Sequence, residues 1–155
     1  MQKEVVDAVL RHLKGSGLKA YVDFPDVEFQ DYAIIVTPVV MRDIPFKSLF
    51  DVKKDLDTAL VSRIVSGGQV TVQIDVYAKT TLLRDTKADE IRRLLKNFPT
   101  PTVESPVRFL RISDSRTLDG PDYYRTTLDA EFEVYEVITD QVPLVQQITS
   151  SIEEV

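Results

Sequence analysis

Three carboxylates stand at alternate positions near the end of the sequence and are its clearest candidates for chemistry. Asp129, Glu131 and Glu133 are separated by apolar residues, so a strand would place all three on one face, about 6 to 7 Å apart. Carboxylates at this spacing act as general acids and bases or hold a hard cation. The pattern also fits a solvated polar face, or the acidic lining of a channel that offers passing DNA no counter-charge.

The remaining side chains offer little catalytic chemistry. The only histidine, His12, is accompanied by no cysteine, so an ordinary metal site is not expected, and we expect His12 on the surface or at its boundary. Residues 15–17 read Gly-Ser-Gly like the start of a dinucleotide-binding loop, but they follow a predicted helix rather than a strand. We therefore predict no enzyme, no catalytic residue, no cofactor and no metal site.

Composition predicts one acidic globular domain. The 155 residues carry a formal net charge of −6, which does not favour a basic nucleic-acid-binding patch. No stretch is long and apolar enough to cross a membrane or to act as a leader, so we expect folding in a cytosol. We expect Arg108, Arg111 and Arg116 on a solvated face or against the acidic strand of a neighbouring copy.

Two amphipathic stretches predict helices. Residues 1–14 repeat apolar side chains with a helical period, and Gly15 follows where a left-handed cap is expected. The second helix is predicted from about Thr81 or Asp85 to Asn97, with Asp85 as a plausible N-cap. A Pro-Thr-Pro sequence then prevents its continuation.

Alternation of apolar and polar residues predicts the strands. They are expected at 19–24, 31–40, 69–77, 107–113 and 123–138. The last two should form an antiparallel hairpin, because a tight polar turn joins them. This order favours an α+β fold, in which helices pack on one face of a mostly antiparallel sheet. We expect one domain over 1–138, followed by a C-terminal arm or short helix over 139–155.

Residues 41–66 are predicted to form a long excursion from this domain. Their large apolar residues fit a ragged helical face, whereas 58–65 fits a strand equally well. Large apolar groups in a long loop need a surface that buries them, either on the home domain or on a neighbour. The candidate interface anchors are Phe46, Leu49, Phe50 and Leu56.

Five segments follow one another in a recognisable order: 1–14, 69–78, 88–95, 108–112 and 123–128. Their pattern and order, although no invariant signature, resemble those of phage tail terminator proteins, also called tail-to-head joining proteins. The resemblance covers residues 1–38 and 67–138. The excursion at 41–66 and the extended C-terminal segment depart from a minimal member, and they would suit arms that reach a neighbouring subunit, the tube or the neck.

The resemblance implies a structural virion protein, assembled in the host cytoplasm. Members form sixfold rings on the end of a long tail tube, stop its growth and give the head a surface to join, without catalysis or cofactor. The partners would be further copies of the chain, the tube protein and the neck proteins. On this interpretation Asp129, Glu131 and Glu133 face the lumen, where DNA passes without specific binding.

Two alternatives stay open. One is another neck or tail part, such as a head-completion or baseplate adaptor. The other is a small cytosolic enzyme or ligand-binding domain, which would require a pocket with convergent polar groups.

Overall fold

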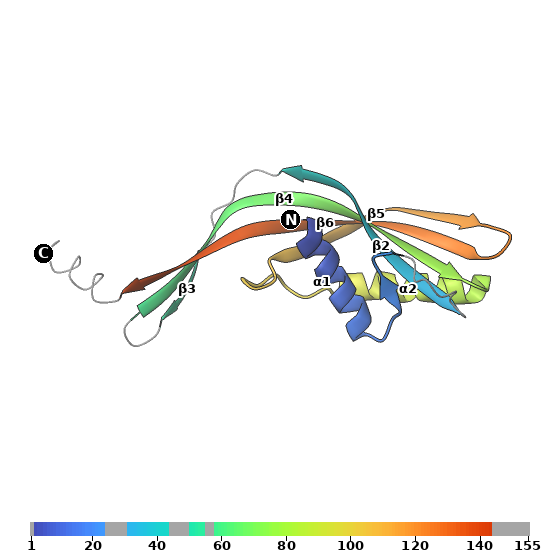
Figure 1. The fold of residues 1–155 in the computed structure, drawn as a ribbon, viewed down its shortest axis with the longest axis horizontal. Coiled ribbons are helices and arrows are strands. Elements are labelled where there is room, and N and C mark those ends of the chain that lie inside the picture. The colour runs from blue at the N-terminus through green and yellow to red at the C-terminus, as the bar shows by residue number, and fades with distance from the viewer. Residues whose placement is uncertain (1, 24–30, 44–49, 55–57, 144–155) are drawn as a thin grey trace, which may run out of the picture.

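The computed structural model describes residues 2–23, 31–43, 50–54 and 58–143, and gives the backbone path alone for 50–54, 58–66 and 142–143. It is an α+β fold with two helices on one face of a mostly antiparallel sheet, as predicted (Figure 1). Neither described helix is long and apolar enough to cross a membrane. The elements are α1 (Gln2–Gly15), β1 (Ala20–Tyr21), β2 (Tyr32–Asp43), β3 (Phe50–Lys54), β4 (Thr58–Ala78), α2 (Thr81–Lys96), β5 (Val107–Asp119) and β6 (Tyr124–Pro143).

The sheet has the strand order β1-β2-β4-β6-β5, and β3 pairs with a separate part of β4. Strand β1 runs parallel to β2 and every other pair is antiparallel. The strand predicted over 19–24 is thus reduced to two residues, paired with Ile34 and Ile35. The hairpin of β5 and β6 is confirmed, and both strands run further than predicted.

Helix α1 forms as its apolar period predicts, but its cap lies two residues later than expected. Gly17, not Gly15, has the positive φ of 85°. The N–H of Gly17 donates to the Lys14 carbonyl at 2.9 Å and that of Leu18 to the Leu13 carbonyl at 3.2 Å, which is the Schellman arrangement. Because Leu13 and Leu18 are both buried, the motif also closes with an apolar contact.

Helix α2 begins at Thr81, and the prediction of Asp85 as its N-cap is wrong. Thr80 is the N-cap, and its hydroxyl accepts a hydrogen bond from the N–H of Leu83 at 3.2 Å. Asp85 instead pairs with the buried guanidinium of Arg84, whose Nε lies 3.0 Å from Asp85 Oδ1. Arg84 also pairs with Asp119 at the end of β5, which fixes the start of α2 to the hairpin.

The core lies between the helices and the near face of β2, β4, β6 and β5. Alternate residues of β4 and β6 contribute most of it, as the period of two in the sequence requires. Phe132 is completely buried and contacts Phe98 and Phe109 edge-on or tilted, with ring centroids 5.3 and 5.5 Å away. Burying a side chain of this size contributes roughly 1.5 to 3 kcal/mol.

The described residues of the excursion, 41–43, 50–54 and 58–66, are β-strand, so for them the helical alternative is wrong and the strand alternative over 58–65 is confirmed. Strand β2 continues to Asp43, β3 covers Phe50–Lys54, and β4 runs without interruption from Thr58 to Ala78. Phe50 begins β3 opposite Arg63. The other three candidate anchors, Phe46, Leu49 and Leu56, lie outside the described residues. Residues 139–143, expected in a C-terminal arm or helix, belong to β6.

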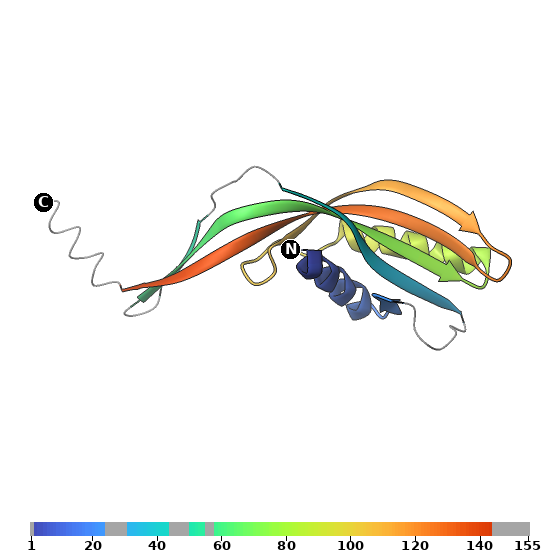
Figure 2. The same cartoon turned by 45° about the horizontal axis from the view of Figure 1, so that its top comes forward.

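These strands build an arm that projects beyond the helices (Figures 1 and 2). We define the arm as β3, residues 58–66 of β4 and residues 135–143 of β6, and call the rest the body. In the arm β4 is the central strand, with β3 on one side and β6 on the other. A β-bulge between Ile64 and Ser66 marks the junction with the body.

Candidate functional site

The three predicted carboxylates do share one face of the sheet. Asp129, Glu131 and Glu133 alternate along β6 with core residues that pack under the helices, so they project from the opposite, helix-free face. They also lie beside β5, as the predicted hairpin requires, but their pairing with its arginines was not foreseen. Its arginines were expected on a solvated face or against a neighbouring copy, whereas here they meet the acidic strand of their own chain.

Each carboxylate has an arginine of β5 beside it. Arg116 Nη1 donates to Asp129 Oδ2 at 2.8 Å, Arg111 Nε lies 2.8 Å from Glu131 Oε2, and Arg108 Nη1 lies 3.8 Å from Glu133 Oε2. Asp114 adds a second carboxylate to Arg116. We call these seven residues the charge ladder: Arg108, Arg111, Asp114, Arg116, Asp129, Glu131 and Glu133.

The charge ladder is close to neutral, because three arginines oppose four carboxylates. The carboxylates of Asp129 and Asp114, in that order, hold the pKa of the Arg116 guanidinium above its usual range. Glu131 is buried and also accepts a hydrogen bond from Gln69 Nε2 at 3.2 Å. The acids are therefore neither freely solvated nor available as an unpaired acidic row.

Tyr135, at the start of the arm, lies next to the charge ladder. Its hydroxyl donates to the Glu133 carboxylate. Burial first, and then this hydrogen bond and the negative charge of Glu133, raise the pKa of Tyr135 to about 12. Glu133 is thus held both by Arg108 and by the phenol.

A second polar cluster on the helix-free face surrounds Asp75 of β4. This carboxylate is only 5% exposed. It accepts hydrogen bonds from Thr127 Oγ1 at 2.5 Å and from Gln73 Nε2 at 2.9 Å, and Arg125 Nε lies 3.6 Å away. Alternation along the strand predicts only that Asp75 faces away from the core, because its partner Thr127 lies 52 residues away and is placed by strand register.

Aromatic rings cover one side of this cluster. Tyr77 and Tyr123 meet edge-on with centroids 5.2 Å apart, and the Arg125 guanidinium lies 5.7 Å from the Tyr77 ring. Burial, and then the negative charge of Asp75, raise the pKa of Tyr77. Because a buried carboxylate needs all its partners satisfied, this arrangement fits a structural clamp between β4 and β6.

His12 connects the two helices. Its Nε2 donates to the carbonyl oxygen of Leu94 at 2.6 Å, which satisfies one of the open carbonyls at the end of α2. Its ring meets Phe98 edge-on at 5.2 Å. His12 is half-buried, so the expectation of a boundary position is confirmed. Among the described residues, no cluster of three or more histidines or acids could hold a metal ion.

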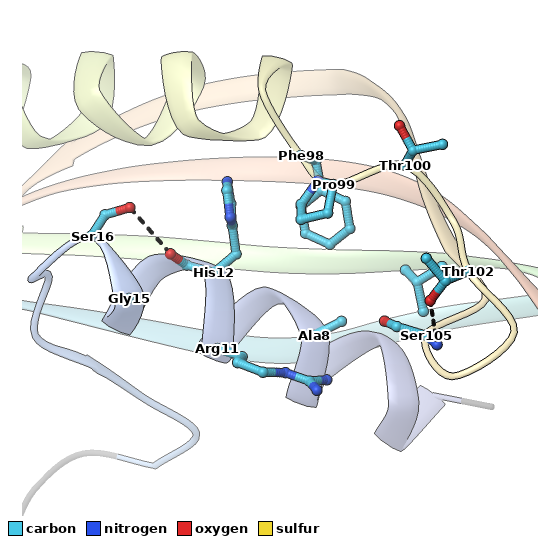
Figure 3. Close-up of a pocket in the computed structure, with 11 residues that line it drawn as sticks. Ala8, Arg11, His12, Gly15, Ser16, Phe98, Pro99, Thr100, Thr102 and Ser105 are labelled. Atoms are coloured by element: carbon cyan, nitrogen blue, oxygen red, sulfur yellow. Dashed lines mark hydrogen bonds between the residues drawn. The ribbon is translucent and has the colours of Figure 1, made fainter.

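A pocket of about 480 Å³ opens beside His12, between α1 and the loop that joins α2 to β5 (Figure 3). Ala8, Phe98, Pro99 and Val107 supply apolar surface. His12 points toward Phe98, and Arg11 lies along α1 at the pocket edge. The remaining lining residues are Gly15, Ser16, Thr100, Thr102 and Ser105, and none of the eleven is acidic.

The described polar groups are largely committed to partners within the chain. Asp75 and Glu131 hold cross-strand neighbours, and Thr102 and Ser105 hydrogen-bond each other within the loop. This arrangement can order strands, hold two helices together and present charged and apolar surfaces. No protein-family model and no curated protein sequence matches the chain.

Proposed function

We propose that this chain is a structural assembly subunit that forms a closed ring of the tail-terminator type. In this role the ring, which has six copies in the family that the chain resembles, caps a phage tail tube, stops its growth and gives the neck proteins of the head a surface to join. The observation that carries the proposal is the arm.

The arm has the form of an element that needs a partner. Nine residues of β4 span about 30 Å at the usual rise of a strand. Both views show the three strands extending past the helices that cover the body. A small ribbon of strands is stable when one face is covered by other protein. Exposed Ile138 on β6 is part of the surface that such a partner would bury.

A second copy is the partner that explains a ring. When the arm of each copy rests on the body of the next, every contact is the same and the contact is heterologous. Such contacts close into a ring if the rotation between copies divides a full turn, and otherwise they continue as a filament. A terminator requires the closed form.

We assign the helix-free face of β5 and β6 to the lumen. The charge ladder on this face carries one net negative charge, so it repels the phosphate backbone weakly and offers no unpaired arginine that would hold DNA. A passage for DNA needs such a surface, whereas a binding site needs accessible positive charge. Asp129, Glu131 and Glu133 keep their proposed lumen positions, now as members of ion pairs.

The first test is native mass spectrometry and negative-stain imaging across a concentration series, alone and with tail tubes. We expect rings with a central hole. Val61→Pro removes a backbone donor from the central strand of the arm, where Val61 lies between Val52 and Asp140, and should abolish rings while circular dichroism still reports a folded body. Val61→Thr keeps the donor and a β-branched side chain and should still form rings.

Persistence of a monomer in every condition, including with tail tubes, would contradict the proposal. Rings that labelling places at the baseplate or on the head alone would favour the adaptor alternative instead. Rings that form equally well with Val61→Pro would show that the arm is not the assembling element.

A further inference from the structure

The pocket beside His12 lies where both helices end in positively charged residues. Arg11 lines the pocket, Lys14 stands in the last turn of α1, and Arg93 and Lys96 stand in the last turn of α2. All four are exposed. None makes an ion pair with a residue that the structure describes, whereas Arg108, Arg111, Arg116 and Arg125 of β5 and β6 are paired.

The helix dipole accounts for part of this placement, because cations are stabilised near helix C-termini. It does not account for the apolar surface beside Arg11. Ala8, Phe98, Pro99 and Val107 supply this surface, and no acidic side chain lines the pocket. An apolar hollow lined by Arg11, close in sequence to further cations at the two helix ends, fits a ligand that combines apolar side chains with carboxylates.

The chain itself contains a segment of that chemistry. Residues 144–155 include two glutamates, Glu153 and Glu154, and no lysine or arginine. Their large aliphatic residues are Leu144, Val145, Ile148, Ile152 and Val155. Ile152 directly precedes the two glutamates, so one short stretch offers an apolar side chain and two negative charges together.

The direction of β6 favours binding of residues 144–155 to the pocket of another copy over binding to the pocket of the same chain. Val134 lies opposite Val107 of the pocket, and from there β6 runs away along the arm to Pro143, about 30 Å further. Twelve extended residues reach about 40 Å, so a return to the pocket of the same chain would use most of that length. The arm already points toward a neighbour in the proposed ring.

We propose that the pocket binds residues 144–155 of a neighbouring copy, with Ile152 on the apolar surface and Glu153 and Glu154 at Arg11 and toward the cations in the last turns of α1 and α2. This inference rests on the proposed function in one respect, because the neighbour is the next copy in the ring. It adds a second contact to the ring, made by residues 144–155 and separate from the contact of the arm.

Disulfide trapping tests the contact directly, because the chain has no cysteine of its own. Full-length Thr100→Cys, at the pocket, is mixed with full-length Ile152→Cys and oxidised. A disulfide between these two proteins, identified by peptide mass spectrometry, can only be intermolecular. Thr37→Cys, exposed on the helix-free face of β2, replaces Thr100→Cys as the matched control.

We expect several-fold more of the 100–152 disulfide than of the control product. Arg11→Glu should reduce it several-fold, and adding Glu153→Lys and Glu154→Lys to the chain that carries Ile152→Cys should restore it. A yield no higher than the control, or one that Arg11→Glu leaves unchanged, would overturn the inference. So would a chain carrying both cysteines that links only within itself.

Imaging of the same samples separates this inference from the ring proposal. Rings without the 100–152 disulfide would overturn the pocket contact and leave the ring standing. The disulfide without rings would support the pocket contact and count against the ring.

Discussion

Arg111 and Glu131 form an ion pair across β5 and β6 in which the two partners differ sharply in exposure. Arg111 Nε lies 2.8 Å from Glu131 Oε2, yet the arginine side chain is 69% exposed and that of the glutamate 9%. The Glu131 carboxylate therefore depends on the ion pair more than Arg111 does, because it has lost most of its contact with water. Gln69 supplies its other described hydrogen bond.

This asymmetry predicts unequal costs for the two truncations. Arg111→Ala should lower the free energy of unfolding by about 2 kcal/mol, because it leaves the buried Glu131 carboxylate without its counter-charge. Glu131→Ala should cost less, about 1 kcal/mol, because the exposed Arg111 guanidinium can then be hydrated and only Gln69 loses a partner. Urea denaturation of both variants and their double mutant measures this. A larger loss for Glu131→Ala than for Arg111→Ala would contradict it.

Neutralising the acids of the charge ladder tests the lumen assignment. Asp129→Asn, Glu131→Gln and Glu133→Gln together change the ladder from one net negative charge to two net positive charges, with little change in side-chain shape. Rings should still form, but DNA release from particles should slow, because the phosphate backbone meets unpaired arginines. Single-particle ejection assays measure the rate.

A matched control removes the same charge from the helical side of the body. It is the triple variant Asp7→Asn, Asp89→Asn and Glu90→Gln. Ejection should match the unsubstituted protein. An equal delay in both triple variants would mean that net charge alone is responsible, and no delay in either would refute the lumen assignment.

Tyr135 should make stability sensitive to alkaline pH. Because burial and Glu133 raise the pKa of its phenol to about 12, the folded state keeps its proton when an unfolded chain, with a pKa near 10, has lost it. The stabilisation is complete below about pH 10 and is lost as the pH rises toward 12. Ultraviolet titration should show one fewer late-ionising phenol in Tyr135→Phe, with a smaller alkaline loss of stability.

His12 should contribute to stability by a hydrogen bond that another aromatic side chain cannot replace. His12→Phe retains an aromatic ring beside Phe98 but cannot donate to the Leu94 carbonyl, and should cost about 1 kcal/mol. His12→Ala also loses the ring contact and should cost about 1 kcal/mol more. Equal thermal denaturation midpoints for His12→Phe and the unsubstituted protein would show that water replaces the bond.

Thr80 and Asp85 should respond differently to substitution. Thr80→Ala removes the hydroxyl that caps α2 and should cost about 1 kcal/mol, whereas Thr80→Ser retains it. Asp85→Ala removes only an exposed partner of Arg84 and should cost less than Thr80→Ala. Chemical denaturation of the three variants would reject the cap assignment if Asp85→Ala proved the costlier change.

Local sequence patterns predicted the body of the fold well. Period-two alternation placed β4 and β6, and a helical period placed α1, because each pattern directly encodes which side faces the core. The caps were misplaced by a few residues. Gly15 and Gly17 can both adopt a positive φ, and Thr80 and Asp85 can both cap a helix. The sequence alone therefore did not decide between them.

The candidate site was only half predictable, because its pairs join distant residues. Alternation placed Asp129, Glu131 and Glu133 on one face, but their pairing with β5 depends on two bulges, at Phe109/Arg111 and at Ile112/Asp114. These irregularities bring arginines to the acids along the strand, and single-sequence alternation does not show them. For the part of the arm that lies in β4, the sequence left helix and strand equally open, because apolar residues recur in it at both helical and strand spacings.

The unbroken course of β4 from arm to body has a mechanical consequence. Strands β4 and β6 remain paired from Ala78 and Tyr124 to Thr58 and Pro143. A force that pulls the arm along its axis would therefore shear the pairing of β4 with β6, so that many backbone hydrogen bonds bear the load at once instead of breaking one by one. Tension applied at the tip would reach the sheet under the helices directly, and the arm would serve as a tie rod between adjoining molecules.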